Sequence, residues 1–298
     1  MRVFVTGAAG FVGSAVTKEL LGAGHEVVGL ARNDDNARKL EAAGAAVHRG
    51  DLADPESLAA GARACDGVAH LAYVHDFSSP EAWQRSTVID RAAVEAMLHV
   101  LEGSGKPFVL TSGTALVAPG RVATENDMPS AEAGGRGATE HLVVNAKDRG
   151  VRSSVIRLPP TTHGEEDKIG FMVQVVNASR RAGAAGYVGD GANRWNAGHQ
   201  RDAARLYRLA LERAEPGSVF HAAAEEGVTL REIAETIAEG LGVPARSITP
   251  EKAQAQFGFL AMFLGFDIPA SSALTRERLG WAPQEVGLLD DMRAHYFG

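Results

Sequence analysis

The chain has 298 residues, of which 45% are hydrophobic and 22% charged, a composition that excludes intrinsic disorder and collagen-like structure. Its formal net charge of −7 argues against nucleic acid or an anionic membrane as a partner, because such ligands select positive surfaces. The single cysteine, Cys65, excludes an intramolecular disulfide framework and indicates a reducing compartment. Since a predicted strand begins at residue 2, with no secretory signal before it, we expect a cytoplasmic protein.

Short β-branched segments alternate with alanine-rich helical segments in the first half of the chain. This alternation is typical of repeated βαβ units and predicts an α/β fold of the Rossmann type, a doubly wound parallel sheet with helices on both faces. The predicted strands span residues 3–6, 27–31, 46–50, 67–72, 108–111 and 154–158. The predicted helices span residues 13–21, 36–43, 57–63, 91–102 and 139–148.

The pattern loosens after Pro160, where glycine-rich and polar loops separate shorter helices. We therefore predict a Rossmann domain over residues 1–165 and a smaller C-terminal substrate-binding domain over residues 166–298. Residues 200–225 are expected to return to the main sheet as a further strand. The longest apolar segment near the C-terminus, 257–266, is about half as long as a membrane-spanning helix.

A G-x-x-G-x-x-G spacing joins the first strand to the first helix, at Gly7, Gly10 and Gly13. Gly7 permits a tight turn, Gly10 lets a pyrophosphate approach the backbone, and Gly13 lets the helix pack closely on the strand. Free N–H groups at the start of the helix supply donors and positive potential for phosphates. The motif predicts a dinucleotide site, with an ordinary glycine-rich turn as the alternative. The expected contacts are Gly7, Ala9, Gly10, Phe11 and Val12.

The end of the second strand indicates which dinucleotide is favoured. A carboxylate there would bind the ribose hydroxyls of NAD, but the sequence has Ala31 followed by Arg32, which can pair with a 2′-phosphate. NADP is therefore favoured. NAD is the alternative, if Asp34 or Asp35 binds the ribose instead.

Further cofactor contacts are expected where the other strands end. Asp51 can accept a hydrogen bond from the adenine amino group, and Leu52 can pack against the adenine ring. A helix N-cap is the alternative near Asp51 or Asp54. The remaining expected contacts are Leu71, Ala72, Thr111 and Pro159.

Five motifs follow one another along the chain: T-G-A-A-G-F-V-G (6–13), D-L (51–52), H-L-A (70–72), R-L-P-P-T-T-H-G (157–164) and W-N-A-G-H-Q-R-D-A-A (195–204). Together they resemble the landmarks of the extended short-chain dehydrogenase/reductase superfamily, the NAD(P)-dependent epimerase/dehydratase-like enzymes, over essentially the whole chain. The resemblance implies a Rossmann domain, a small C-terminal substrate domain, and a cofactor lying across the carboxyl edge of the sheet.

The chain departs from that family at its usual catalytic residues. Family members use a Tyr-x-x-x-Lys pair with a serine or threonine; the tyrosine transfers the proton, and the lysine lowers its pKa and holds the ribose. None of the four tyrosines here is followed by lysine at that spacing. With Glu140 as the anchor, the tyrosine position falls near Glu132 and the lysine position near Arg136, and the serine position falls at Gly113. The chain thus resembles the atypical branch, which keeps the cofactor site without this triad.

Other side chains at the strand ends are candidates to replace these residues. Ser112 and Thr114 follow the fifth strand and can hydrogen-bond a substrate carbonyl, or else stabilise a turn. His75, beside Asp76, is a candidate proton donor because imidazole titrates near neutrality; a capped loop is the alternative. His163 is a second candidate, at a place that the resemblance implies is close to the nicotinamide.

Substrate contacts are expected from both parts of the chain. The candidates in the loops and helix starts are Asp76, Arg136, Arg194 and Trp195, which offer charge and, at Trp195, a flat apolar face. Phe263 lies in the segment 257–266, a candidate lid or wall for an aromatic substrate or, alternatively, a buried helix or subunit contact.

The sequence gives less indication of a metal ion or of a second copy of the chain than of the cofactor and a small-molecule substrate. The acidic residues of 164–171 lack the alternating spacing of a calcium loop, so no metal site is expected. A homodimer could form through the helices after the fourth and fifth strands, although the same residues could equally pack on the sheet. These residues are Ala92, Ala93, Val94, Met97 and Val144.

Three functions fit the sequence. The first is an NAD(P)(H)-dependent oxidoreductase of the atypical short-chain type acting on a small carbonyl, quinone or aromatic compound, to which the cofactor gives a hydride and the protein a proton. The second is an NAD(P)-binding redox sensor or accessory protein without turnover. The third is a tailoring enzyme, an epimerase, dehydratase or monooxygenase, acting on a natural-product intermediate.

Overall fold

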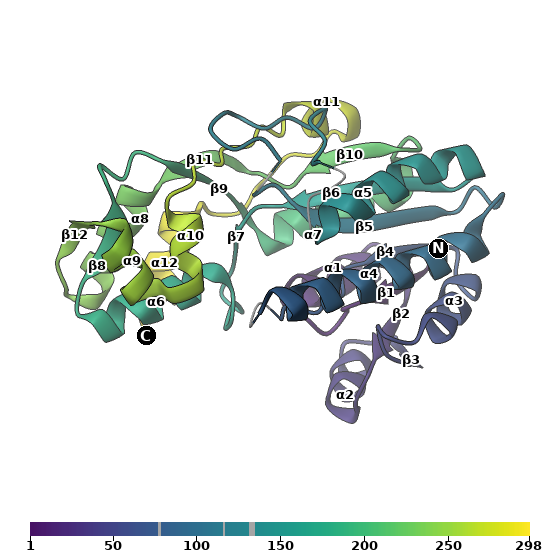
Figure 1. Ribbon diagram of the computed structural model, residues 1–298. Coiled ribbons are helices and arrows are strands. Elements are labelled where there is room, and N and C mark those ends of the chain that lie inside the picture. Colours follow the sequence, from purple (N-terminus) through teal and green to yellow (C-terminus); the bar gives the residue numbers. More distant parts are fainter. Residues whose placement is uncertain (77–78, 116, 131–134) are drawn as a thin grey trace.

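A seven-stranded parallel sheet forms the larger part of the molecule (Figure 1). The computed structural model describes residues 1–76, 79–115, 117–130 and 135–298. In the spatial order β10-β6-β5-β4-β1-β2-β3, the strands are Ser218–His221, Arg152–Leu158, Pro107–Gly113, Gly67–His70, Arg2–Thr6, Glu26–Ala31 and Ala46–Arg49. The predicted α/β fold with a doubly wound parallel sheet is confirmed.

Helices cover both faces of this sheet. One face carries α1 (Phe11–Gly22), α2 (Asp34–Ala42) and α7 (Gln200–Arg213), and the other carries α3 (Pro55–Arg63), α4 (Pro80–Leu101), α5 (Arg136–Asn145) and the short helix η1 (Ala146–Arg149). Val3 and Val5 of β1 enter the first core, whereas Phe4 between them enters the second. All three are fully buried, which is why this strand is apolar at successive positions.

Helix α4 begins earlier than the sequence pattern suggested. The prediction of a start at residue 91 was wrong, because the helix begins at Pro80. Ser79 caps it by accepting a hydrogen bond from the backbone N–H of Ala82 at 3.1 Å, and proline suits the first helical position. Within α4, Val94 and Met97 are fully buried against the sheet, so the packing alternative describes them better than a subunit contact.

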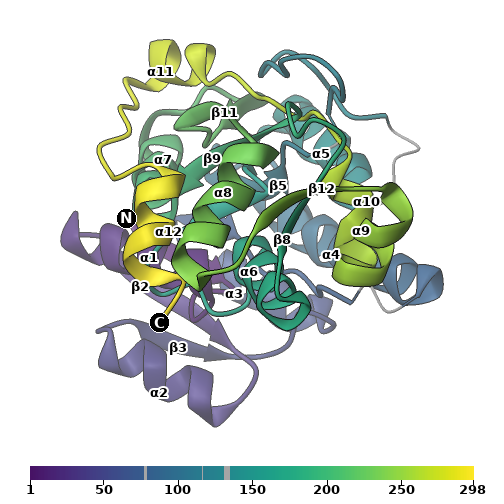
Figure 2. The same ribbon diagram turned by 90° about the vertical axis from the view of Figure 1, so that its left-hand side faces the viewer.

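Two short sheets and a group of helices make up the smaller part, which faces the viewer in Figure 2. One sheet has the order β11-β9-β7 (Glu225–Thr229, Arg194–His199, Thr161–His163), and the other pairs β12 (Ala245–Ile248) with β8 (Ala185–Val188). The helices are α6 (Phe171–Ala182), α8 (Leu230–Leu241), α9 (Pro250–Phe257), η2 (Gly258–Leu260), α10 (Ala261–Leu264) and α12 (Leu288–His295). Helix α11 (Ala273–Leu279) instead contacts α7 and β10 of the larger part.

The chain passes between the two parts more than once. It leaves the main sheet after β6, forms β7, α6, β8 and β9, and returns as α7 and β10, where Val219 of β10 pairs in parallel with Val155 of β6. It then leaves again to form β11, α8, β12, α9, η2 and α10, comes back to place α11 against α7 and β10, and ends in the smaller part with α12. Across the described ranges, no helix has the length and apolar character required to cross a bilayer.

Candidate functional site

The turn between β1 and α1 requires glycine at two positions. Gly7 has a φ of +70°, and a Cβ there would lie 2.8 Å from the backbone nitrogen of Ala72. A Cβ at Gly13 would lie 1.9 Å from the carbonyl oxygen of Gly7. The turn therefore brings the start of α1 close to the ends of β1 and β4, and a side chain at either glycine would disrupt this cradle.

Helix α1 starts without a side-chain cap. Its N-cap residue is Gly10, whereas Asn33, Asp54 and Ser79 accept backbone hydrogen bonds at the starts of α2, α3 and α4. The first backbone N–H groups of an α-helix have no acceptor within the helix, so those of α1 are available to an anion. Ala9, Phe11 and Val12 surround this N-terminus, as the sequence motif predicts.

The two carboxylates that follow β2 have cationic partners, whereas the arginine before them has no carboxylate partner among the described residues. Asp34 pairs with Arg49 at 2.7 Å, and Asp35 pairs with Lys39 at 2.7 Å. Arg32 is exposed and forms no hydrogen bond or ion pair with any residue that the structure describes. Both candidate carboxylates thus have cationic partners, while the guanidinium is open to an anionic ligand.

Because these strands are parallel, the residues after β3 and β4 lie at the same edge of the sheet as the glycine turn. Asp54 caps α3 by accepting from the N–H of Ser57, so it takes the capping role that the sequence left open. Asp51 is exposed and accepts from the N–H of Ala53, and Leu52 is buried. Beside β4, the N–H groups of Leu71 and Ala72 both donate to the Thr6 hydroxyl at 3.1 Å, and Pro159 follows β6.

Arg136 joins the carboxyl ends of β4 and β5. Its guanidinium donates to the carbonyl oxygens of Ala72 and Thr111 and, through Nε and Nη2, to the Asp90 carboxylate at 3.1 and 2.9 Å. These bonds use Nε–H, both Nη2–H groups and one Nη1–H, so one of the five donors of the guanidinium is left. Arg136, near which the sequence analysis expects the family's lysine position, thus fixes the edge of the sheet.

Asp90 is the buried counter-ion of this arrangement. It also lies 3.3 Å from Nε2 of His70, whose Nδ1 is 2.8 Å from the Thr6 hydroxyl. Burial alone would raise the pKa of Asp90, but the Arg136 charge and the His70 hydrogen bond lower it to about 2. A buried carboxylate held in this way is structural.

His75 and Asp76 follow β4 in an accessible loop. The His75 side chain is exposed, and its ring meets the ring of Tyr73 edge-on, with 5.1 Å between centroids. The guanidinium of Arg136 lies over the other ring of this pair, 4.9 Å from the centroid of Tyr73. Desolvation and the positive charge of Arg136 lower the pKa of His75 below its ordinary value. Glu132, at the expected tyrosine position, lies outside the described residues.

The hydroxyl groups at the end of β5 have buried protein partners. Ser112 donates to Glu140, Thr111 shares a 2.6 Å hydrogen bond with the Tyr207 hydroxyl, and Thr114 donates to the Asn196 side chain at 3.0 Å. The three hydroxyls are therefore held by neighbouring helices and loops. This arrangement favours the structural alternative over substrate binding for Ser112 and Thr114. The sequence could not show it, because the partners of Thr111 and Thr114 lie 96 and 82 residues away.

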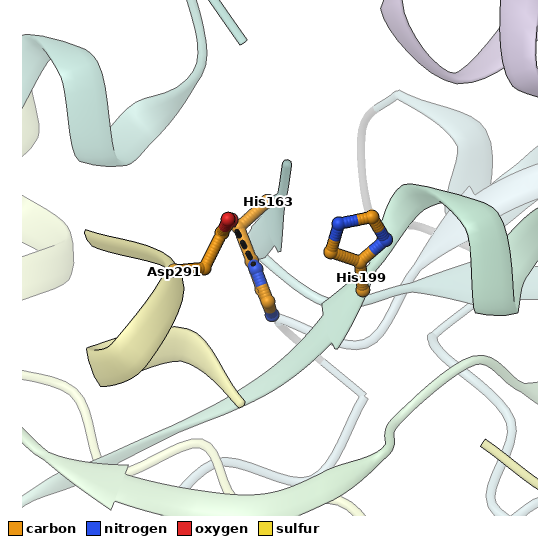
Figure 3. Close-up of side chains that lie close together, drawn as sticks. All are labelled: His163, His199 and Asp291. Carbon is orange, nitrogen blue, oxygen red and sulfur yellow. Dashed lines mark hydrogen bonds and ion pairs between the residues drawn. The ribbon is translucent and has the colours of Figure 1, made fainter. Parts of the chain in front are cut away.

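His163 lies in the smaller part of the molecule. It is buried at the end of β7, where its Nδ1 lies 2.8 Å from Oδ2 of Asp291 in α12 (Figure 3). Its ring meets that of His199 edge-on, with 5.3 Å between centroids. The structure thus joins His163 to two residues that the sequence analysis did not connect with it, and not to His75.

The expected substrate residues of the smaller part differ in their burial and in their contacts. The expectation that Trp195 offers a flat accessible face was wrong, because its side chain is fully buried in the core around β9. Arg194 pairs with Asp267 at 2.9 Å. Phe263 is only partly buried, and it meets Phe259 edge-on at 5.4 Å between centroids, so segment 257–266 contributes both to the core and to the surface.

Phe263 belongs to an apolar patch at the edge of the smaller part. Phe259 and Met262 beside it are 43% and 51% exposed. Phe171 at the start of α6 meets Phe263 edge-on at 5.5 Å between centroids. Large apolar side chains exposed together mark a surface that is able to contact an apolar ligand or partner.

Known proteins resemble this chain along its whole length. A family model described as the NAD dependent epimerase/dehydratase family matches residues 3–224. An uncharacterized protein of Saccharomyces cerevisiae is 46% identical, with 99% of each chain covered. A reductase of Stigmatella aurantiaca, named a 4-hydroxy-2-methyl-3-oxo-4-farnesyl-3,4-dihydroquinoline-1-oxide ketoreductase, is 26% identical over 95% of this chain and 92% of its own.

A solved structure shares the same architecture. The UDP-glucose 4-epimerase of Thermus thermophilus, solved in complex with NAD, superposes with a TM-score of 0.73. The superposition covers 100% of this chain and 99% of the epimerase, at 22% sequence identity. At this identity the likeness shows the fold.

Proposed function

The chain belongs to the NAD-dependent epimerase/dehydratase family, and on that basis we propose that it is an NADP(H)-dependent oxidoreductase that reduces the carbonyl group of a small, largely apolar compound such as a ketone or a quinone. The observation that carries the proposal is the cradle formed by Gly7, Gly13 and the uncapped start of α1. Its free amides and the space that only glycine leaves suit a pyrophosphate.

The charges after β2 favour NADP over NAD. Asp34 and Asp35 are both paired with cations, whereas Arg32 is free among the described residues and able to pair with a 2′-phosphate. Ala31 at the end of the strand has no group that could accept from ribose hydroxyls. Asp51 and Leu52 would meet the adenine, and Leu71 and Ala72 lie beside the glycine turn, where they would contact the nicotinamide half.

The protein's part in the reaction is to position the carbonyl compound and to provide a proton. A nicotinamide held in this cradle would supply the hydride for the carbonyl carbon. His75 is the best-placed proton source for the carbonyl oxygen, because its ring is accessible beside the strand end that Arg136 fixes. The remaining Nη1–H of Arg136 can hold a ribose or substrate oxygen at the same edge.

The apolar patch of Phe259, Met262 and Phe263 supports an apolar substrate. Flat rings and alkyl groups gain by covering such a surface, whereas a sugar nucleotide would need cations for its phosphates. Arg194 is engaged by Asp267, so it does not offer such a charge. The name of the Stigmatella aurantiaca relative, a ketoreductase of a farnesylated dihydroquinoline, points to the same substrate class.

One assay tests the proposal. NADPH and NADH are titrated into the purified protein by fluorescence, and a panel of ketones and quinones is then screened for cofactor oxidation. We expect tighter binding of NADPH and turnover of at least one apolar carbonyl compound. No binding of either dinucleotide would contradict the proposal.

A second function, binding of the dinucleotide without turnover by a redox sensor or accessory protein, is favoured by one observation. The hydroxyls of Ser112 and Thr114 are committed to buried partners, and no tyrosine of the sequence is followed by lysine at the family's spacing. Tight NADPH binding with no turnover over a broad panel would support it. Turnover that consumes oxygen, or that epimerises or dehydrates the substrate, would indicate the tailoring-enzyme alternative. A cytoplasmic location and a homodimer stay predictions.

A further inference from the structure

Two imidazoles and one carboxylate from three separate elements meet inside the smaller part of the molecule (Figure 3). His163 ends β7, His199 ends β9, and Asp291 lies in the first turn of α12. All three are buried, with at most 2% of their surface exposed. Each offers one potential ligand atom, and these atoms lie within 4.8 Å of one another.

The cluster lacks a fixed positive charge. Within the described part of the chain, Asp291 has no lysine or arginine partner; it lies 2.8 Å from His163 and 3.8 Å from the half-exposed His295. By contrast, the buried carboxylates of Asp90 and Glu140 each face a guanidinium group. A buried carboxylate without a cation is costly, so this position favours a proton or a metal ion between Asp291 and the imidazoles.

The ring of His163 is also incompletely satisfied by the protein. Its Nε2 is buried and has no hydrogen-bond partner among the residues described here. Buried polar atoms normally have partners, but an ion bound at Nδ1 would leave this nitrogen unchanged; the feature that an ion there would compensate is the Asp291 carboxylate.

We propose that His163, His199 and Asp291 bind a divalent metal ion of the zinc class, with water at the fourth position. Two imidazole nitrogens and one carboxylate oxygen form a ligand set that Zn²⁺ prefers, and three protein ligands with one open position are common at such sites. The site is independent of the proposed dinucleotide cradle, which lies at the other sheet. It also goes beyond the sequence, which carries no local metal-binding spacing.

The ligand atoms need only modest rearrangement. Nδ1 of His163 and Oδ2 of Asp291 are 2.8 Å apart, so an ion can replace the proton between them. Nδ1 of His199 accepts a hydrogen bond from the N–H of Arg201 at 3.1 Å and caps α7, which leaves the proton on Nε2. Coordination through Nε2 would move that proton to Nδ1 and remove the cap, a loss that is small beside the free energy of zinc binding.

A cavity borders the residues that follow two of the proposed ligands in the chain. The cavity, of about 610 Å³, has Gln200 and Arg201 in its wall, the two residues directly after His199. Glu165 and Glu166, which follow His163 closely, line it as well. Its wall also holds Lys18, Arg205 and Arg208, and Glu165 and Glu166 pair there with Arg201 and Lys18.

The experiment measures metal binding by the full-length protein without any cofactor. The protein is stripped with a chelator, dialysed against ZnCl₂ and analysed for metal content; Co²⁺ then serves as a spectroscopic probe. We expect one zinc per chain, a visible Co²⁺ spectrum typical of four-coordinate nitrogen and oxygen ligands, and a higher unfolding temperature with zinc.

Variants assign the ligands. His199→Gln and Asp291→Asn should bind zinc at least about 100-fold more weakly, because removal of a ligand should cost no less than loss of an outer-shell partner. His99→Gln, which alters an imidazole that is 79% exposed, is the matched control and should bind normally.

Two results would overturn the proposal. One is a zinc content of the wild-type protein well below one per chain, which would mean that only a proton joins His163 and Asp291. The other is equal zinc binding by the ligand variants and the control. If a variant does not fold, the stoichiometry and the Co²⁺ spectrum of the wild-type protein decide alone. Because no dinucleotide is present, failure here leaves the proposed oxidoreductase function untouched.

Discussion

Arg32 offers the sharpest test of cofactor choice at the scale of a single residue. We predict that Arg32→Ala weakens NADPH binding about 10- to 100-fold, the effect expected for loss of hydrogen bonds between charged groups. NADH binding should change by less than about twofold, because NADH has no 2′-phosphate. Fluorescence titration of both cofactors measures the effect. Arg38→Ala, at an exposed arginine on α2, is the control, and equal weakening of both cofactors by Arg32→Ala would refute the assignment.

His75 should make the reduction pH-dependent. Its pKa is lowered from 6.5 by desolvation and by Arg136, so the ring is mostly neutral at about pH 7 and can donate a proton only in its minor, charged form. We therefore predict that the turnover of the reduction falls as the pH rises through that lowered pKa. The reverse oxidation, which needs the neutral ring as a base, should rise over the same range.

The variant that tests this prediction is His75→Gln. Its pH–rate profile is measured for the reduction and for the reverse oxidation. The variant should lose the pH-dependent limb and most of the turnover, with little change in NADPH affinity. If the variant shows the same pH-dependent fall in rate as the wild-type protein, His75 is not the proton source. Substitution of His141, whose Nε2 contacts the carbonyl of Pro129 outside the site, serves as the control.

Sequence reasoning at this scale succeeded where the signal is local. The glycine turn was found because its conformation depends on neighbours a few residues away, whereas the role of Arg32 stays a prediction. Trp195 was misjudged because its burial depends on packing by helices much later in the chain, such as α8 and α10. His163 was separated from its partner Asp291 by 128 residues, a distance over which periodicity and spacing carry no information.

At the scale of an element, the close packing of α1 on the glycine turn can be tested by a glycine-to-alanine substitution, which adds one methyl group. Gly13→Ala places a Cβ 1.9 Å from the Gly7 carbonyl oxygen, so α1 has to move away from the turn. We predict a loss of about 1–3 kcal/mol in the free energy of unfolding, as for other overpacked positions, together with loss of dinucleotide binding. Chemical denaturation and fluorescence titration measure the two effects.

Gly22→Ala provides the control in the same helix. No atom lies within 4 Å of a Cβ at Gly22, so alanine should leave binding unchanged and alter stability by no more than about 1 kcal/mol, in the favourable direction. If Gly13→Ala behaves like Gly22→Ala, the turn does not determine the position of α1.

The elements themselves were largely predictable, and the errors lie at their ends. Continuous apolar segments identified the buried strands, because a parallel strand is covered on both faces. The start of α4 was missed although Ser79 and Pro80 form a standard helix start, because the polar first turns of this helix have no apolar periodicity. The short strands β7, β8 and β12 were not predicted, since three or four residues carry too little pattern.

For the whole molecule, cofactor binding should appear as added stability. A ligand that binds only the folded state stabilises it by about 2.7 kcal/mol when present at 100 times its Kd. We therefore predict a clear rise in the unfolding temperature with saturating NADPH and a smaller rise with the same concentration of NADH. Thermal denaturation measures the two unfolding temperatures, with the protein in buffer without cofactor as the reference. An unchanged temperature with both cofactors would contradict the dinucleotide site.

The return of α7 and β10 to the main sheet has a consequence for how the protein is made. Leu206, Tyr207 and Leu211 of α7 are fully buried against the first sheet, although they are translated after much of the smaller part. A fragment ending at residue 165 would expose to water the part of that sheet face that α7 covers, and should aggregate. On the ribosome, the N-terminal half must therefore wait in an unfinished state, and this interval is where the nascent chain would most need a chaperone.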